Sequence, residues 1–178
     1  MRMIERRINA PMTSSLGRLF DAAAAVILGR HTVDYEAQAA IELEGAAVDE
    51  PDGTQGYALS LSGGRWPGEP ATLSTGALWR EMMADLENGV NNNKVAARFH
   101  AGIAKGFVQA AVAARAATEI ETVALSGGVL HNGRLSRLLR AGLEAQGFQV
   151  FQHRRVSPGD GGLSYGQAAV AAALLRKR

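Results

Sequence analysis

The last third of the chain has an order of segments that allows few folds. Residues 122–125 form a short apolar run, followed by a glycine turn and a helical pattern that ends before Gly147. A second apolar run at residues 148–151 is followed by another glycine-rich turn and a helical pattern over about residues 163–175. Strands that alternate with turns and helices in this way lie parallel and are joined by crossover helices. The sequence therefore predicts an α/β fold.

The segments before this unit predict helices and one insertion. Capping residues and periodic apolar positions predict four helices, over about residues 16–28, 35–44, 74–88 and 93–116. Asp34 is the expected cap of the second of them. Residues 45–73 are rich in proline and glycine, and the alternating run at residues 57–61 predicts a strand. This stretch is too short to be a domain, so we expect a strand and loop insertion within one lobe that spans residues 1–178.

Composition excludes several classes of protein. Apolar residues make up 47% of the chain and charged residues 20%, which is typical of a globular domain. The chain has no cysteine, so disulfides, a thiol nucleophile and cysteine-based metal sites are excluded. The net charge of +2 is too small to indicate nucleic-acid binding. No apolar run reaches the ~18–20 residues of a membrane span, and the N-terminus does not resemble a signal peptide. We therefore expect a cytoplasmic protein without a membrane or nucleic-acid partner.

The glycine turn at residues 125–129 (LSGGV) is the first candidate site. Glycines between a strand and a helix let the backbone approach a ligand closely, and the N–H groups at a helix start suit an anion. In an open α/β sheet, ligands bind beyond the carboxyl ends of the strands, where this turn lies. The same tripeptide occurs at residues 62–64, but Pro67 follows it and no helix can begin there. We interpret that copy as a plain turn, whereas the tripeptide at residues 126–128 leaves phosphate binding and a plain turn both open.

Several polar residues and one glycine have both a structural and a ligand-binding interpretation. Asn132 is either a structural residue (a helix cap or a solvent-facing amide), which the pattern favours, or a ligand contact. Asp160 is a helix cap or a metal ligand, with the cap favoured from pattern alone. Gly17 and Asp21 are one helical turn apart and share a face, which suits either helix packing or ligand access. Glu36, in the first turn of the helix predicted over residues 35–44, is a surface acid that complements the helix dipole or an acceptor for ribose hydroxyls.

The histidines give no catalytic assignment. His100 is expected to be a hydrogen-bonded, half-buried histidine on the long helix, and His131 a surface residue. No catalytic triad, paired-histidine metal motif or phosphate-binding lysine loop is present in the sequence. We therefore nominate no catalytic acid, base or nucleophile from spacing.

Five segments of the sequence, taken together and in this order, form a further pattern. They are residues 13–22, 35–40, 97–100, 125–129 and 153–162. Together they resemble the C-terminal part of the hydrogenase-maturation carbamoyltransferase family, HypF. The resemblance covers nearly the whole chain and is weakest over residues 45–73.

The resemblance implies a fold and a set of site residues. The fold would be the C-terminal lobe of a two-lobed actin-like ATPase (ASKHA, ribonuclease-H-like), helix-rich with a small mixed sheet and shared with tRNA threonylcarbamoyl-transfer enzymes. Gly127 and Gly128 would hold ATP phosphates, and Asp160 would bind a divalent metal. The expected nucleotide-binding set is Gly17, Asp21, Glu36, Gly127, Gly128 and Asn132.

The resemblance also implies a reaction. In the family, carbamoyl phosphate and ATP give a carbamoyl-adenylate, and the carbamoyl group passes to the C-terminal cysteine of HypE, for nickel–iron hydrogenase maturation. Family members are several times longer than this chain, and the first lobe holds the paired histidines that complete the metal site. We therefore expect the isolated chain to bind nucleotide weakly, to be inactive, and to pair with a first lobe or a second copy of itself.

Three alternatives remain open at this level. The first is a tRNA threonylcarbamoyl-transfer relative, which the residues 153–162 argue against. The second is an O-carbamoyltransferase of small-molecule biosynthesis, which shares the same lobe. The third is of another class, a non-catalytic fragment that binds nucleotide or docks on a separate protein.

Overall fold

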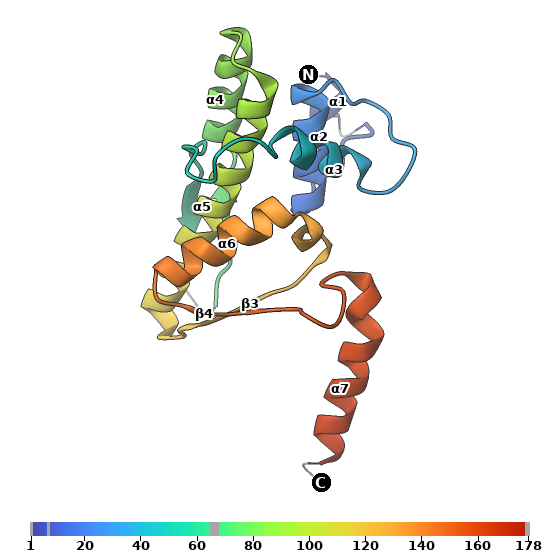
Figure 1. Ribbon diagram of the computed structural model, residues 1–178, viewed down its shortest axis with the longest axis vertical. Helices are drawn as coiled ribbons and strands as arrows, with labels where there is room; N and C mark the ends of the chain where they lie inside the picture. The colour runs from blue at the N-terminus through green and yellow to red at the C-terminus, as the bar shows by residue number, and fades with distance from the viewer. Residues whose placement is uncertain (1, 7, 65–67, 177–178) are drawn as a thin grey trace.

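Helices account for most of the fold, and two small sheets accompany them (Figure 1). The structure is a computed structural model that describes residues 2–6, 8–64 and 68–176. The α-helices are α1 (Arg2–Glu5), α2 (Leu16–Ile27), α3 (Gln38–Ala46), α4 (Gly76–Glu87), α5 (Asn92–Thr118), α6 (Gly133–Ala145) and α7 (Leu163–Leu175). The strands are β1 (Ser60–Gly63), β2 (Ala71–Ser74), β3 (Thr122–Leu125) and β4 (Gln149–Gln152), and two short 3-10 helices are η1 (Gly128–His131) and η2 (Asp160–Gly162).

The apolar core lies where α2, α3, α4 and α6 pack around the long helix α5. Val95, Phe99, Ile103 and Phe107 recur every four residues, which is typical of one buried face of a helix. The first three are buried in α5, but Phe107 is 40% exposed, so the buried face ends one turn before it. The Phe20 ring of α2 meets the Phe99 ring edge-on at a centroid distance of 5.0 Å. Such aromatic pairs add to the free energy gained from burial.

Helix α2 begins and ends as the sequence predicts. The Ser15 hydroxyl accepts a hydrogen bond from the Arg18 N–H at 3.4 Å, which caps the first turn. Gly29 has a φ of +67°, the left-handed conformation that commonly ends a helix. Local residue types are therefore sufficient to fix both ends of this helix.

Helix α3 begins later than predicted, at Gln38 instead of Tyr35. Asp34 does not cap it: the Asp34 N–H donates to the Gln38 side-chain oxygen at 2.7 Å, so the helix's own first residue orders the preceding turn. Ala37 has a φ of +63°, which breaks the helical path. Glu36 consequently lies in the turn before α3 and not in its first helical turn.

The insertion forms a hairpin in which β1 and β2 pair antiparallel, with Ser60 opposite Ser74. The strand begins at Ser60 and not at Tyr57, because the chain around Tyr57 crosses α5 at close range. A Cβ built on Gly102 would lie 2.5 Å from the Tyr57 carbonyl oxygen, so glycine is required at that crossing. The Tyr57 N–H donates to the Arg98 carbonyl of α5 at 3.2 Å, and Tyr57 is buried there.

The last third has the predicted order, and β3 and β4 pair in parallel with Thr122 opposite Gln149. Among the described residues, the expected small mixed sheet is instead two separate sheets, one antiparallel and one parallel, each of two strands. Helix α6 packs against α5 and covers the parallel pair on one side (Figure 1). Helix α7 extends away from this body, and all thirteen of its residues are exposed. None of the helices in the described ranges is long and apolar enough to cross a membrane.

Candidate functional site

Two turns meet at the carboxyl ends of β3 and β4. The first turn follows β3 at residues 126–128, and the second turn follows β4 at residues 153–159. The parallel register places Leu125 opposite Gln152, so both turns leave the sheet at the same edge. The Gly127 N–H donates to the Pro158 carbonyl at 2.7 Å, and the Ser126 hydroxyl donates to the same oxygen at 3.3 Å. A Cβ on Gly159 would lie 3.2 Å from the Gly128 Cα, so the second turn packs closely on the backbone of the first.

The first of these turns leaves its backbone accessible. Gly127 has a φ of +114°, a conformation that side chains other than glycine rarely adopt. A Cβ built on Gly127 or on Gly128 would meet nothing within 4 Å. The first N–H groups of η1, which begins at Gly128, have no carbonyl partner within that helix. A small anion can therefore reach donor groups at this turn.

The other copy of the tripeptide lies in the β1–β2 hairpin, with Gly63 and Gly64 at φ values of +69° and +84°. A Cβ on Gly64 would come within 2.8 Å of the Ala71 Cβ. This copy is thus packed against the neighbouring strand and has no open space above it. It is the plain turn that the sequence predicts.

A cavity of about 550 Å³ lies between α2, α3, η1 and the turn before α7. Its lining includes six of the seven residues predicted for nucleotide or metal binding: Gly17, Asp21, Glu36, Gly128, Asn132 and Asp160. Gly127, the seventh, faces a neighbouring groove. Residues up to 143 positions apart in the sequence are therefore brought to one cavity, which we call the central cavity. Their roles toward a ligand stay predictions.

The α2 side of the central cavity contains Gly17 and Asp21. A Cβ on Gly17 would lie 3.8 Å from the Val129 side chain, an ordinary contact, so helix packing does not require glycine at this position. The Asp21 carboxylate forms an ion pair with Arg18 at 2.8 Å and is 29% exposed. Arg18 and Glu36 also line the cavity, so these three residues together carry one more carboxylate than cation.

Asn132 is the N-cap of α6, as the structural interpretation predicts. Its Oδ1 accepts from the Leu135 N–H at 2.8 Å, and its Nδ2 lies 3.0 Å from Nε2 of His100. Asn132 is 8% exposed and also lines the central cavity. His100 is fully buried instead of half-buried, and burial lowers the pKa of its imidazole to about 4.

Sequence reasoning missed Glu44, which closes the N-terminus of α6. Its carboxylate accepts from the Gly133 N–H at 2.7 Å and from the Arg134 N–H at 3.2 Å. Arg134 is 3% exposed and donates to the carbonyls of Ala47, Glu50 and Pro51 at 2.6–2.9 Å. Because Glu44 already occupies this helix start and the Gly127 N–H donates to Pro158, the anion-binding N–H groups that remain are those at the start of η1.

Two histidines at the turns were also missed. His131, predicted to be a plain surface residue, is exposed but lies with its Nε2 3.1 Å from the Ser157 hydroxyl, and it lines the central cavity. His153 lies with its Nε2 3.1 Å from the Ser126 hydroxyl. Each pair joins one turn to the other. The partners are 26 and 27 residues apart, so no local pattern in the sequence indicates them.

Asp160 is exposed at the start of η2 and lines the central cavity. In the part of the chain that the structure describes, no three His, Cys, Asp or Glu side chains come together as a metal site requires. The residues present therefore do not form a complete site for the divalent metal that the resemblance implies. Asp160 is the one carboxylate that was predicted as a metal ligand, and we derive no metal-dependent step from it.

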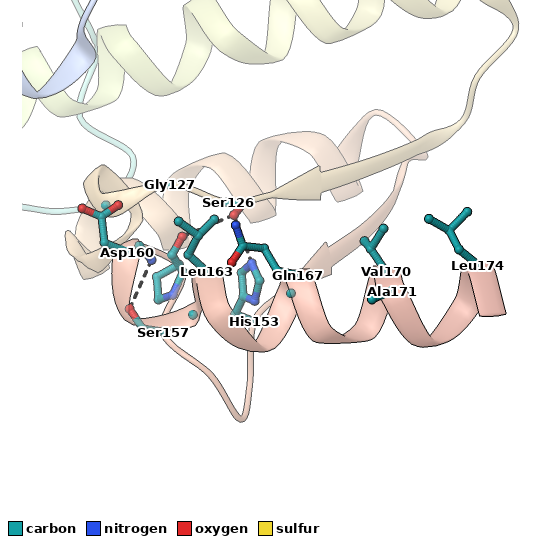
Figure 2. A pocket seen from close by; sticks show the side chains of 15 residues that line it. Ser126, Gly127, His153, Ser157, Asp160, Leu163, Gln167, Val170, Ala171 and Leu174 are labelled. Carbon is teal, nitrogen blue, oxygen red and sulfur yellow. Dashed lines mark hydrogen bonds between the residues drawn. The ribbon is translucent and has the colours of Figure 1, made fainter. Parts of the chain in front are cut away.

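A second groove, of about 700 Å³, runs along α7 (Figure 2). Ser126, Gly127 and His153 lie at one end, and apolar side chains of α7 such as Val170 and Leu174 continue it (Figure 2). Large exposed apolar surfaces of this kind commonly bind another protein surface. We call it the α7 groove.

Comparison with known proteins agrees with this arrangement. Residues 1–167 match the family described as carbamoyltransferase, Kae1-like domain, second subdomain. The chain is 39% identical to a carbamoyltransferase HypF homolog of Cupriavidus necator, over 96% of this chain and 43% of that protein. It is 38% identical to carbamoyltransferase HypF of Rhodobacter capsulatus, over 94% of this chain and 21% of that protein. The chain thus spans less than half the length of these relatives.

Two solved structures are similar over almost the whole chain. Full-length HypF in its phosphate- and nucleotide-bound form superposes with a TM-score of 0.86 and 33% identity, over 98% of this chain and 22% of that one. HypF of T. kodakarensis superposes with a TM-score of 0.81 and 26% identity, over 99% of this chain and 22% of that one. The predicted fold class is confirmed. The chain belongs to the HypF carbamoyltransferase family and corresponds to the second subdomain of its Kae1-like domain.

Proposed function

We propose that this chain forms one wall of the nucleotide site of an ATP-dependent carbamoyltransferase. The reaction would take a carbamoyl group from carbamoyl phosphate through a carbamoyl-adenylate to the C-terminal cysteine of a HypE-like protein, for nickel–iron hydrogenase maturation. The central cavity is the observation that supports this proposal most, because residues predicted from the sequence to bind nucleotide line one space. The bound phosphate and nucleotide named for the similar HypF structure support the same class of ligand.

Charge suggests how a nucleotide would lie in the cavity. The end formed by Gly128 offers backbone N–H groups, which suit phosphate oxygens. The end formed by Asp21 and Glu36 offers carboxylates, which repel phosphate and accept hydrogen bonds from sugar hydroxyls. We therefore orient the phosphates toward Gly128 and the ribose toward Glu36.

The chain's contribution to catalysis in this proposal is binding and orientation. Backbone donors that are fixed before the ligand arrives stabilise phosphate charge without reorganisation. No described side chain of the central cavity is assigned as a catalytic acid, base or nucleophile. Asp160 would face the phosphates as a second anion, so we expect the isolated chain to bind ATP weakly and not to turn it over.

We further propose that the first subdomain of a Kae1-like domain covers the α7 groove. All residues of α7 are exposed, although eleven of the thirteen are Ala, Val, Leu, Tyr or Gly. The same arrangement, α7 included, superposes on chains about four to five times as long, in which further chain is present to cover it. Light scattering of the purified chain tests this: a stable dimer would show that a second copy covers the surface instead.

Calorimetric titration of the chain with ATP tests the nucleotide site. Gly128→Val places a side chain in space that is open in the structure, so we expect the fold to persist and the ATP affinity to fall at least about tenfold. Gly45→Ala is the matched control, because its Cβ also meets nothing within 4 Å but Gly45 does not line the cavity. An equal affinity in the two variants would contradict the site, and so would the absence of any ATP binding by the wild-type chain.

The alternative enzymatic functions differ in the molecule that accepts the carbamoyl-type group. The relatives at hand are named HypF carbamoyltransferases, which favours the hydrogenase-maturation reaction over transfer to tRNA or to a small molecule. If the chain forms a complex of higher light-scattering mass with a first-subdomain partner but binds no nucleotide, the docking fragment is favoured. In that case the central cavity would be a structural cleft only.

A further inference from the structure

His100 and Asn132 form a buried polar pair beneath the central cavity. His100 is fully buried, with its ring edge-on to the rings of Phe20 and Phe99 at centroid distances of 5.2 and 5.9 Å. Both of its ring nitrogens nevertheless have partners: Nδ1 lies 2.8 Å from the Ala96 carbonyl oxygen and Nε2 lies 3.0 Å from Nδ2 of Asn132. A polar ring in such apolar surroundings is stable only with these hydrogen bonds.

The partners determine which atom donates in each bond. The Ala96 carbonyl can only accept, so Nδ1 of His100 bears the proton and donates to it. In the neutral ring Nε2 then accepts, and Asn132 Nδ2 donates to it. The Asn132 Oδ1 accepts from the Leu135 N–H on its other side. Rotating the amide by half a turn would break both of its bonds, so its orientation is fixed.

One N–H of the Asn132 amide remains after these bonds are counted. An Asn amide has two N–H donors, and His100 uses one of them. The side chain lines the central cavity and is otherwise buried, at 8% exposed, so we infer that the remaining donor is reached from the cavity side. A fixed donor loses less entropy on binding than a freely rotating one.

We propose that His100 is a positioning residue, which fixes the Asn132 amide so that its remaining N–H donates to an acceptor atom of the nucleotide. This inference rests on the proposed nucleotide site. His100 itself touches no ligand and acts through Asn132. A purely structural histidine would affect stability but not the orientation of the amide.

Three variants separate these roles. His100→Leu removes the acceptor for Asn132 and suits the apolar surroundings. His100→Gln restores an acceptor oxygen near the same position and is the conservative rescue. Phe99→Leu is the matched control, because Phe99 packs on the His100 ring in the core but does not line the cavity.

Calorimetry with ATP and thermal unfolding give the first readout. At a temperature where all variants are folded, we expect His100→Leu to lose affinity between about threefold and tenfold, as one misplaced hydrogen bond would cause. His100→Gln should stay within about threefold of wild type. Phe99→Leu should unfold at a lower temperature yet bind ATP as wild type does. Equal affinity of His100→Leu and wild type, or an equal loss in Phe99→Leu, would overturn the proposal.

Nuclear magnetic resonance of the Asn132 side-chain amide gives a readout that needs no ligand. We expect two separate N–H resonances in wild type and His100→Gln, one of them protected from solvent exchange by the bond to residue 100. His100→Leu should lose that protection. If wild type binds no ATP, the proposed function fails, while unchanged Asn132 resonances in His100→Leu would overturn the positioning role alone.

Discussion

The buried His100 should make the stability of this chain fall as the pH drops below neutrality. Burial lowers the pKa of its imidazole from 6.5 to about 4, and the positive charge of Arg134 adds to this effect. In the unfolded chain the ring recovers an ordinary pKa. The folded state therefore binds fewer protons than the unfolded state between pH 6.5 and about 4.

The sign and size of the effect follow from this difference. The contribution of His100 is fully present above pH 6.5 and is lost progressively as the pH falls toward 4, because the unfolded ring gains a proton that the folded ring excludes. A change from 6.5 to about 4 corresponds to about 3 kcal/mol, at about 1.4 kcal/mol per tenfold change in proton affinity. At pH 4.5 we expect a loss of about 2 to 3 kcal/mol in the free energy of unfolding.

Urea unfolding at several pH values between 7 and 4.5, followed by circular dichroism, measures this loss. His100→Gln is the comparison, because the glutamine amide does not titrate. The quantity compared is the change of the free energy of unfolding with pH, so the absolute stability of the variant does not matter. Glu42 and Asp52 have lowered pKa values, so they too destabilise the fold as the pH falls, but they do so in both proteins. Equal slopes for wild type and His100→Gln would refute the assignment of a neutral, buried His100.

Two further predictions concern the packing that supports the central cavity. Arg134→Ala leaves three carbonyls of residues 47–51 without their donors, so we expect a loss of about 2–4 kcal/mol in the free energy of unfolding, measured by urea titration. An unchanged midpoint would show that these bonds do not stabilise the fold. Gly102→Ala would place a Cβ 2.5 Å from the Tyr57 carbonyl and should cost at least about 2 kcal/mol. Gly45→Ala, in a helix with open space around it, should instead add up to about 1 kcal/mol, and equal effects of the two glycine substitutions would contradict the close crossing.

The sequence predicts most of the elements because their ends depend on neighbouring residues. Ser15 and Gly29 fix α2 through a cap and a positive φ, and both are visible in the sequence. The strand predicted at residues 57–61 begins instead at Ser60, because Gly102 lets the preceding chain cross α5. That crossing joins segments about 45 residues apart, and no local pattern contains it.

In the candidate site, too, features set by neighbouring residues can be predicted and features set by distant residues cannot. Residues of the glycine turns are recognisable because their types and spacing along the chain are unusual, and the fold brings them to one cavity. Glu44 could not be predicted, since its bond to Gly133 spans 89 positions and a glutamate in a helix is ordinary. His100 is ordinary in the same sense: its role depends on Asn132, which is 32 positions away.

The occupied start of α6 limits where a phosphate can bind. A strand, a glycine turn and a helix predict an anion at the helix start, and this chain has two such starts after β3, at η1 and at α6. The second is filled, because the Asn132 amide and the Glu44 carboxylate already accept from its first N–H groups. A phosphate there would have to displace a carboxylate and would lie beside it. In the first turn the Gly127 N–H already donates to the Pro158 carbonyl, but no described group accepts from the Gly128 N–H. A nucleotide in the central cavity should therefore contact Gly128 with its phosphates and meet Asn132 through the amide nitrogen alone.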